Sequence, residues 1–175
     1  MAAAGAAPGA PRRSAGWRFA LACAAVAVLS AGCALPAREA PGALKSDVLA
    51  RLGPPNAVYA LPSGERLLYT ELPAGFAAYN LDFDASGRLV RNEQVLTQSR
   101  FEALTASGWN AQDVQRTFGP PVLVERVARF DGDIWTYRFR QNSDSRLAHV
   151  HLDRQGVVRQ VIFTDELPNF DNARD

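Results

Sequence analysis

Two short stretches of the chain place apolar residues at helical spacing and then end in Gly-Pro-Pro. The apolar positions are Leu44, Val48, Leu49 and Leu52 in the first stretch and Val114 and Phe118 in the second. Apolar residues three or four positions apart share one face of a helix, and proline cannot continue a helix. The pattern therefore predicts one helix ending near Gly53 and another near Gly119, with a short extra helix at 101–104 preceding the second.

After each Gly-Pro-Pro, apolar and polar residues alternate, which is the pattern of half-buried strands. The predicted strands are 56–61, 65–72, 78–84 and 88–96, then 122–130, 133–140, 146–153 and 157–164. Glycine allows the positive φ of tight turns, and it occurs at Ser63-Gly64, Ser86-Gly87, Asp131-Gly132 and Gln155-Gly156. Strands joined by tight turns are antiparallel, so each set of four predicts an antiparallel meander.

The alternation also predicts which face of the second meander is buried. Trp135, Tyr137, Phe139, Val150 and Leu152 are expected to face the core, and Thr136, Arg138, Arg140, His149, His151 and Asp153 are expected to face solvent. Each meander would then be covered by helices on its apolar face. Its opposite face would be exposed to solvent.

The two halves of this pattern repeat each other in sequence. Asp47-Val48 and Leu52-Gly53-Pro54-Pro55 return 66 residues later as Asp113-Val114 and Phe118-Gly119-Pro120-Pro121. A repeated supersecondary pattern is typical of an internal duplication. We therefore expect an α+β fold with a tandem duplication, each unit having one or two helices packed on a three- to four-stranded antiparallel sheet. The expected units are 44–98 and 99–166, followed by a flexible polar tail at 167–175.

The first 32 residues are interpreted as an export signal. Three arginines precede an apolar run at 19–29 that is too short to span a bilayer, and small residues follow it. Ser30-Ala31-Gly32-Cys33 resembles the lipobox of bacterial lipoproteins, although Ser30 stands where that pattern prefers Leu or Val. The alternative is an ordinary secretory signal with an incidental cysteine.

The lipobox resemblance implies that Cys33 becomes the first mature residue and carries acyl chains on its thiol and on its new amine. Each buried methylene adds about 0.8 kcal/mol of membrane affinity, so three chains would anchor the protein stably. Residues 33–43 would form a tether, because they are small and rich in proline. Ala34 follows the cysteine, and by the same resemblance the destination is the periplasmic face of the outer membrane.

Removing the signal changes the charge and the cysteine content. The chain has 19 basic residues, of which Arg12, Arg13 and Arg18 lie in the signal, so 16 basic residues remain against 18 acidic ones, a net charge of −2. This balance gives no support for a nucleic-acid partner. Cys23 also lies in the signal, so the mature chain has no pair of cysteines for an internal disulfide.

The chain resembles the SmpA/OmlA (BamE-like) lipoprotein family. The resemblance rests on the lipoprotein signal, on the run from Gly42 to Pro55, which contains Asp47-Val48 and Leu52-Gly53-Pro54, and on Trp135-Thr136-Tyr137. The resemblance implies two helices on a three-stranded antiparallel sheet and a non-enzymatic role beside the machinery that inserts β-barrels into the outer membrane. The chain departs from the family by having two copies, and the first copy has Tyr69-Thr70-Glu71 where Trp-x-Tyr is expected. The tandem arrangement also resembles β-lactamase-inhibitory proteins, which clasp an enzyme.

Several residues are candidates for a site. His149, His151 and Asp153 share a strand face and are residue types that ligate metals, but exposed polar residues explain them as well, and no metal or other cofactor is predicted. Arg138 and Arg140 beside these histidines predict either a cationic stripe for a partner or a solvated face of mixed charge. Trp109 is either a partly exposed interface anchor or a hydrophobic staple at the start of a helix.

No motif predicts catalysis. The sequence contains no nucleophile elbow, metalloprotease motif or phosphate loop, and the carboxylate pairs Asp82/Asp84 and Asp131/Asp133 are interpreted as turn residues. The predicted function is a lipid-anchored scaffold that binds an envelope protein, and the family resemblance implies the β-barrel assembly machinery as its partner. The alternative is a module that binds a small molecule or a cell-wall ligand in a cleft between the two repeats.

Overall fold

The structure is a computed structural model that describes Met1, Gly5 and residues 34–106 and 108–167. The predicted signal, apart from Met1 and Gly5, lies outside the described residues, as do Cys33 and residues 168–175. The described residues from Leu35 onward belong to one compact unit. Within the described ranges, no helix is both long and apolar enough to cross a membrane.

The compact unit contains two antiparallel sheets of four strands, each with its strands in sequence order. The first half consists of η1 (Pro36–Arg38), α2 (Lys45–Leu52), β1 (Ala57–Leu61), β2 (Gly64–Thr70), β3 (Ala78–Asp84) and β4 (Leu89–Gln94). The second half consists of α3 (Gln98–Glu102), η2 (Ala103–Ala106), α4 (Ala111–Phe118), β5 (Leu123–Glu125), β6 (Gly132–Gln141), β7 (Asp144–Asp153) and β8 (Val158–Asp165). The predicted α+β class with two helix-and-sheet halves is confirmed.

Both long helices end where the sequence predicts. Gly53 follows α2 with φ 77°, and Gly119 follows α4 with φ 82°, so each occupies a conformation that residues with a side chain rarely adopt. The proline pair after each glycine then prevents the helix from continuing.

The two halves repeat the same hydrogen bonds. The Tyr69 hydroxyl donates to the Gly53 carbonyl at 2.9 Å, and the Tyr137 hydroxyl donates to the Gly119 carbonyl at 3.1 Å. Tyr69 is therefore the counterpart of Tyr137, which corrects the alignment that matched Tyr69 with Trp135. The first copy has Leu67 at the position of the tryptophan.

The turns that end β3 and β7 are also built alike. Asp84 accepts hydrogen bonds from the backbone N–H groups of Ser86 and Arg88, and Asp153 accepts them from Gln155 and Val157. The Ser86 hydroxyl also donates to Asp84, at 2.6 Å. Hydrogen bonds to a carboxylate stabilise its charged form, so the pKa of Asp84 is lowered, chiefly by the Ser86 hydroxyl, and that of Asp153 is lowered, chiefly by the Val157 N–H. The prediction that Asp84 serves the turn is confirmed.

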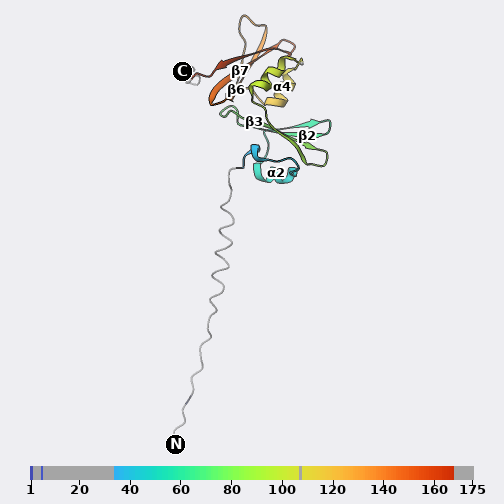
Figure 1. The fold of residues 1–175 in the computed structure, drawn as a ribbon, viewed down its shortest axis with the longest axis vertical. Coiled ribbons are helices and arrows are strands. Elements are labelled where there is room, and N and C mark those ends of the chain that lie inside the picture. Colours follow the sequence, from blue (N-terminus) through green and yellow to red (C-terminus); the bar gives the residue numbers. More distant parts are fainter. Residues whose placement is uncertain (2–4, 6–33, 107, 168–175) are drawn as a thin grey trace. The chain divides into compact units, whose positions relative to one another are not determined.

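The first sheet is buried on both faces (Figure 1). One face packs against α2 through a cluster that includes Val48, Leu67 and Phe83. The other face packs against the second half, where Leu68 joins Phe118 in a larger cluster. The prediction of a wet opposite face is wrong here, because the second half of the chain covers the face that α2 leaves open.

The contact between the halves is close. The Asn80 side-chain amide donates to the Thr117 carbonyl at 3.1 Å in a buried position. A Cβ placed at Gly119 would lie 3.3 Å from Leu68, so the end of α4 approaches β2 more closely than most side chains would allow. The two halves therefore share one core, composed of the residues Leu68, Ala78, Val95, Leu96, Phe101, Leu104, Val114, Phe118, Tyr137, Phe139, Ala148, Val150, Leu152 and Val158.

The outer face of the second sheet also departs from the prediction. Thr136 is fully buried and His151 is 7% exposed, although both were expected to face solvent. The same face contains the apolar residues Ile134 and Leu147, and the Phe130 ring lies edge-on to His151 at 4.8 Å. Neighbouring side chains thus bury the centre of this face.

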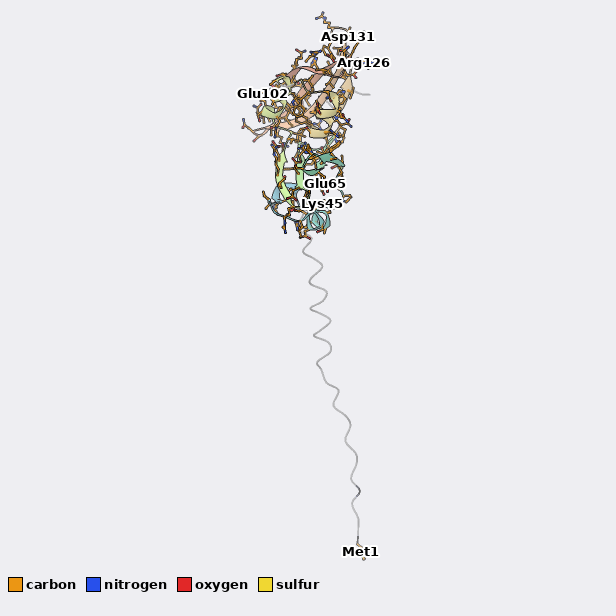
Figure 2. The ribbon with its side chains drawn as sticks, turned by 90° about the vertical axis from the view of Figure 1, so that its right-hand side faces the viewer. Met1, Lys45, Glu65, Glu102, Arg126 and Asp131 are labelled. Carbon is orange, nitrogen blue, oxygen red and sulfur yellow. The ribbon has the colours of Figure 1, made fainter. Side chains whose placement is uncertain are left out.

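One predicted strand is much shorter than expected. Strand β5 has three residues, and the rest of the predicted segment 122–130 forms a loop that leads to β6. Ion pairs lie near the outer ends of both halves, as Lys45 with Glu65 and Asp131 with Arg154 (Figure 2). Such exposed or half-exposed pairs contribute little to stability.

Candidate functional site

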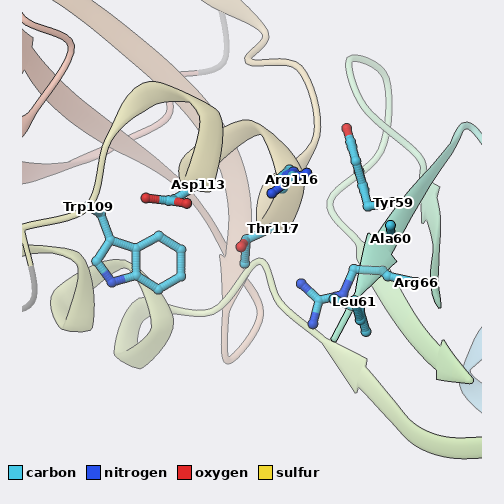
Figure 3. A pocket seen from close by; sticks show the side chains of 8 residues that line it. All are labelled: Tyr59, Ala60, Leu61, Arg66, Trp109, Asp113, Arg116 and Thr117. Carbon is cyan, nitrogen blue, oxygen red and sulfur yellow. The ribbon is translucent and has the colours of Figure 1, made fainter. Parts of the chain in front are cut away.

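A groove of about 350 Å³ lies between β1 of the first half and α4 of the second (Figure 3). Its lining residues are Tyr59, Ala60, Leu61, Arg66, Trp109, Asp113, Arg116 and Thr117. In Figure 3, Trp109, Asp113 and Arg116 belong to the α4 side, and Tyr59 and Arg66 belong to the sheet side. The shared core beneath fixes the separation of these two walls.

Trp109 forms one end of this groove. It directly precedes Asn110, the N-cap of α4, and its carbonyl accepts a 2.8 Å hydrogen bond from the Val158 N–H. The indole is half-buried against the shared core and also lines the groove. This is the position of a hydrophobic staple. Trp109 can therefore serve both as a staple and as an interface anchor, the two roles that were predicted for it.

Arg66 is held in the groove by an ion pair that was not predicted from the sequence. Its guanidinium donates to both Asp82 oxygens, at 2.6 and 2.8 Å, and the two side chains are 17% and 11% exposed. Asp82 therefore does not serve a turn, as was predicted for the Asp82/Asp84 pair. It fixes and neutralises a half-buried arginine on the face between the repeats.

Arg116 is the second cation of the groove. Its guanidinium carbon lies 5.8 Å from the centre of the Tyr59 ring, and the residue is exposed. Within the described part of the chain, Arg116 forms no ion pair. The neighbouring Asp113 is engaged by the Asn110 N–H at 3.2 Å as part of a capping box. Arg116 thus keeps its hydrogen-bond donors available to a ligand.

Arg138 and Arg140 contact the first half of the chain. The Phe76 ring, in the loop between β2 and β3, lies 5.5 Å from the Arg138 guanidinium and 4.5 Å from that of Arg140. Arg138 also donates to the Pro73 carbonyl at 3.2 Å, forms an ion pair with Glu166 and is only 14% exposed. The predicted cationic stripe is therefore largely an internal contact between the two repeats.

His149 and His151 are engaged by neighbouring polar groups on the sheet. The two ring nitrogens of His149 lie 2.9 Å from the Thr136 hydroxyl and 3.0 Å from the Thr164 hydroxyl. Burial lowers the pKa values of both histidines, and for His151 the nearby His149 lowers the value further. Across 34–106 and 108–167, no three His, Cys, Asp or Glu residues gather into a possible metal site.

A second cavity of about 500 Å³ lies at the end of the second sheet where β6 begins and β7 ends. Its polar lining is largely paired, with Arg126 bound to Asp133 and Arg154 bound to Asp131. Trp135 lines this cavity and is half-buried, and it packs against the shared core on the face that was predicted to be buried. Because its charges neutralise each other, this cavity is a weaker candidate than the groove.

Tyr59, Arg66 and Arg116 were not predicted as site residues from the sequence. Comparing the two copies gives one signal for the groove, because Ala43 and Ala50 of the first copy correspond to Trp109 and Arg116 of the second. The correspondence follows from the common 66-residue offset, and Ala43, like Trp109, accepts a hydrogen bond from a residue that follows a turn. Trp109 and Arg116 therefore have no counterpart of similar size or charge in the first copy, and this difference is the signal.

No protein-family model matches the chain, and no curated protein sequence matches it. A similar solved structure is that of a DUF4309 family protein (YjgB) from Bacillus subtilis subsp. subtilis str. 168, which is 18% identical. The match covers 71% of this chain and 79% of that chain, with a TM-score of 0.30.

Proposed function

We propose that this protein is a lipid-anchored interaction module on the periplasmic face of the outer membrane, where it binds an envelope protein. The observation that carries the proposal is the groove between β1 and α4, which presents Trp109, Tyr59 and Arg116 together. Tryptophan, tyrosine and arginine are the residue types that most often dominate the energy of protein interfaces. The Ser30–Cys33 segment supports the anchor, and the likeness to SmpA/OmlA lipoproteins supports a role in outer-membrane assembly or envelope integrity.

The anchor is tested by the intact mass of the native protein. Cleavage before Cys33 with acylation gives a mass above that of the mature polypeptide, and Cys33→Ala abolishes the increase. A native mass that matches an unmodified secreted chain would contradict the anchor.

The interaction is tested by affinity purification from detergent-solubilised envelopes. We expect Trp109→Ala and Arg116→Ala to lose a partner that the wild-type protein retains in stoichiometric amount. Arg129→Ala is the matched control, because Arg129 is exposed and does not line the groove. Equal recovery of the partner by all four proteins would show that the groove is not the interface.

A second function is favoured by the size of the groove. Its volume of about 350 Å³ lies within the usual range of small-ligand sites, roughly 300–1,000 Å³. A module for a small molecule or a cell-wall ligand would show a ligand-induced increase in melting temperature, which Trp109→Ala would remove. It would also yield no protein partner in the purification.

A further inference from the structure

We infer that the open edge of β1 accepts an extended, carboxylate-bearing segment of a partner protein as an added strand, with Arg116 binding the carboxylate. The inference rests on the proposed interaction function and specifies how the groove is used. Strand addition to a sheet edge is an established mode of peptide recognition, in which main-chain hydrogen bonds give affinity and side-chain pockets give specificity.

The composition of β1 distinguishes it from the other sheet edges. Strand β1 pairs only with β2 and has the sequence Ala-Val-Tyr-Ala-Leu, without a charged residue or a proline. Proteins usually protect edge strands with charges, prolines or covering segments, because an open edge is a template for another strand. Val58 on this edge is 55% exposed.

The other three terminal strands carry such protection. Strand β4 is covered by the preceding chain, since the Asn92 side chain donates to the Pro36 and Glu39 carbonyls. Strand β5 has three residues and ends in a glutamate, and β8 contains Arg159 and Asp165. In the described part of the chain, β1 is the one terminal strand that has neither a charged residue nor a hydrogen bond to a segment that covers its edge.

The hydrogen-bond register shows which backbone groups of β1 face outward. Leu61 pairs with Gly64 across a two-residue turn, and hydrogen-bonded pairs alternate along an antiparallel ladder. On the far side of β2, the Glu71 N–H donates to the Ala77 carbonyl at 2.9 Å, which fits the same alternation. The backbone groups of Val58 and Ala60 therefore point away from the sheet.

The groove lies beside this edge and defines the chemistry of the added strand. Tyr59 and Leu61 project from β1 into the groove, and Trp109 stands on the opposite wall (Figure 3). These residues favour an apolar side chain. The charge of Arg66 is already neutralised by Asp82, whereas Arg116 forms no ion pair in the described part of the chain. A carboxylate in the added strand would supply the missing partner of Arg116.

Ala60→Pro is a sharp test, because it removes an N–H that faces away from the sheet. Proline is tolerated in edge strands at such positions, so the pairing of β1 with β2 remains. The control is Asp165→Pro in β8, whose N–H also faces outward, since the next residue, Glu166, donates to the Ser145 carbonyl. Circular dichroism of both variants verifies that the fold is retained.

The probes are short fluorescent peptides that alternate valine and threonine around a central glutamate or a central lysine. We expect the full chain in detergent to prefer the glutamate peptide by about tenfold, a difference of roughly 1.4 kcal/mol. Ala60→Pro should abolish binding, Asp165→Pro should not affect it, and Arg116→Glu should reverse the preference. Binding that survives Ala60→Pro, or a preference that Arg116→Glu leaves unchanged, would overturn the inference.

Cross-linking in cells separates this inference from the proposed function. A photoreactive residue at position 58 should cross-link to an extended segment of a partner, mapped by mass spectrometry, and Ala60→Pro should eliminate the adduct. If affinity purification recovers a partner but position 58 gives no adduct, the strand-addition mode is wrong and the proposed function survives. If neither experiment yields a partner, both are wrong. Adducts only between copies of this chain would show self-association and overturn the inference.

Discussion

At the scale of single residues, Tyr69 and Tyr137 make the same hydrogen bond, to the carbonyls of Gly53 and Gly119, but differ in burial. The Tyr137 hydroxyl is fully buried and its burial raises the pKa of the phenol, whereas Tyr69 is 8% exposed. Tyr137→Phe leaves the buried Gly119 carbonyl without its donor, which costs about 1–3 kcal/mol. Tyr69→Phe should cost about 0.5–1.5 kcal/mol, because water can reach Gly53 more easily. Urea denaturation of both variants measures the difference, and equal losses would contradict it.

The two histidines predict how stability depends on pH. Burial lowers their pKa values in the folded state, so below about pH 6.5 the unfolded chain binds more protons than the folded one. The free energy of unfolding should therefore decrease as the pH falls from about 7.5 toward the lowered pKa values. Thermal melts across this range measure the effect, and His149→Gln combined with His151→Gln should flatten it.

The acidic turn residues act in a different pH window and provide an internal control. The pKa values of Asp84 and Asp153 are lowered, so their contribution to stability is present above about pH 3.8 and is lost as the pH falls through the lowered values. The histidine double variant should leave this acid transition in place. A pH dependence above 5 that survives the double variant would contradict the assignment to the histidines.

At the scale of elements, the two helices differ in how they begin. Helix α4 has a capping box between Asn110 and Asp113, whereas Leu44 at the equivalent position of α2 has no side-chain cap. Asn110→Ala should destabilise the protein by about 1 kcal/mol. Leu44→Asn should stabilise it by about 0.5–1 kcal/mol, because Asp47 already occupies the position of Asp113 and completes the box.

Chemical denaturation of the two cap variants measures both effects. Leu44→Ala is the control for the loss of the leucine side chain, which is 41% exposed. If Leu44→Asn and Leu44→Ala have the same stability, the transferred cap does not form.

The sequence predicts the elements of this fold better than it predicts which faces are covered. Helix ends follow from the local chemistry of Gly53 and Gly119, and turns follow from Asp84 and Asp153, so the pattern alone locates them. Burial of Asp82 and Arg138 depends on which distant segment packs over the sheet, and alternation along one strand carries no information about that. The groove was missed for the same reason, because β1 and α4 are distant in the sequence and the packing of the two halves brings them together.

At the scale of the whole molecule, the shared core predicts that both repeats unfold together. Leu81 lies in the cluster against α2, and Phe139 lies in the shared core between the halves. Leu81→Ala and Phe139→Ala should each cost about 2–5 kcal/mol and shift one common transition. Tryptophan fluorescence reports mainly the second half, because Trp109 and Trp135 lie there, and far-ultraviolet circular dichroism reports both. Two separate transitions in either variant would contradict a single cooperative core.

The same core predicts that the first repeat does not fold alone. A fragment of residues 34–98 would expose Leu68, Ala78, Val95 and Leu96, which are at most 1% exposed in the whole protein. Only the cluster against α2 would remain, and a domain of this size is marginal even with a complete core. We expect poor amide dispersion in the NMR spectrum of this fragment. Mixing it with residues 99–175 should restore dispersed signals, since the two surfaces are complementary, and a fragment that unfolds cooperatively by itself would show that the repeats are independent domains.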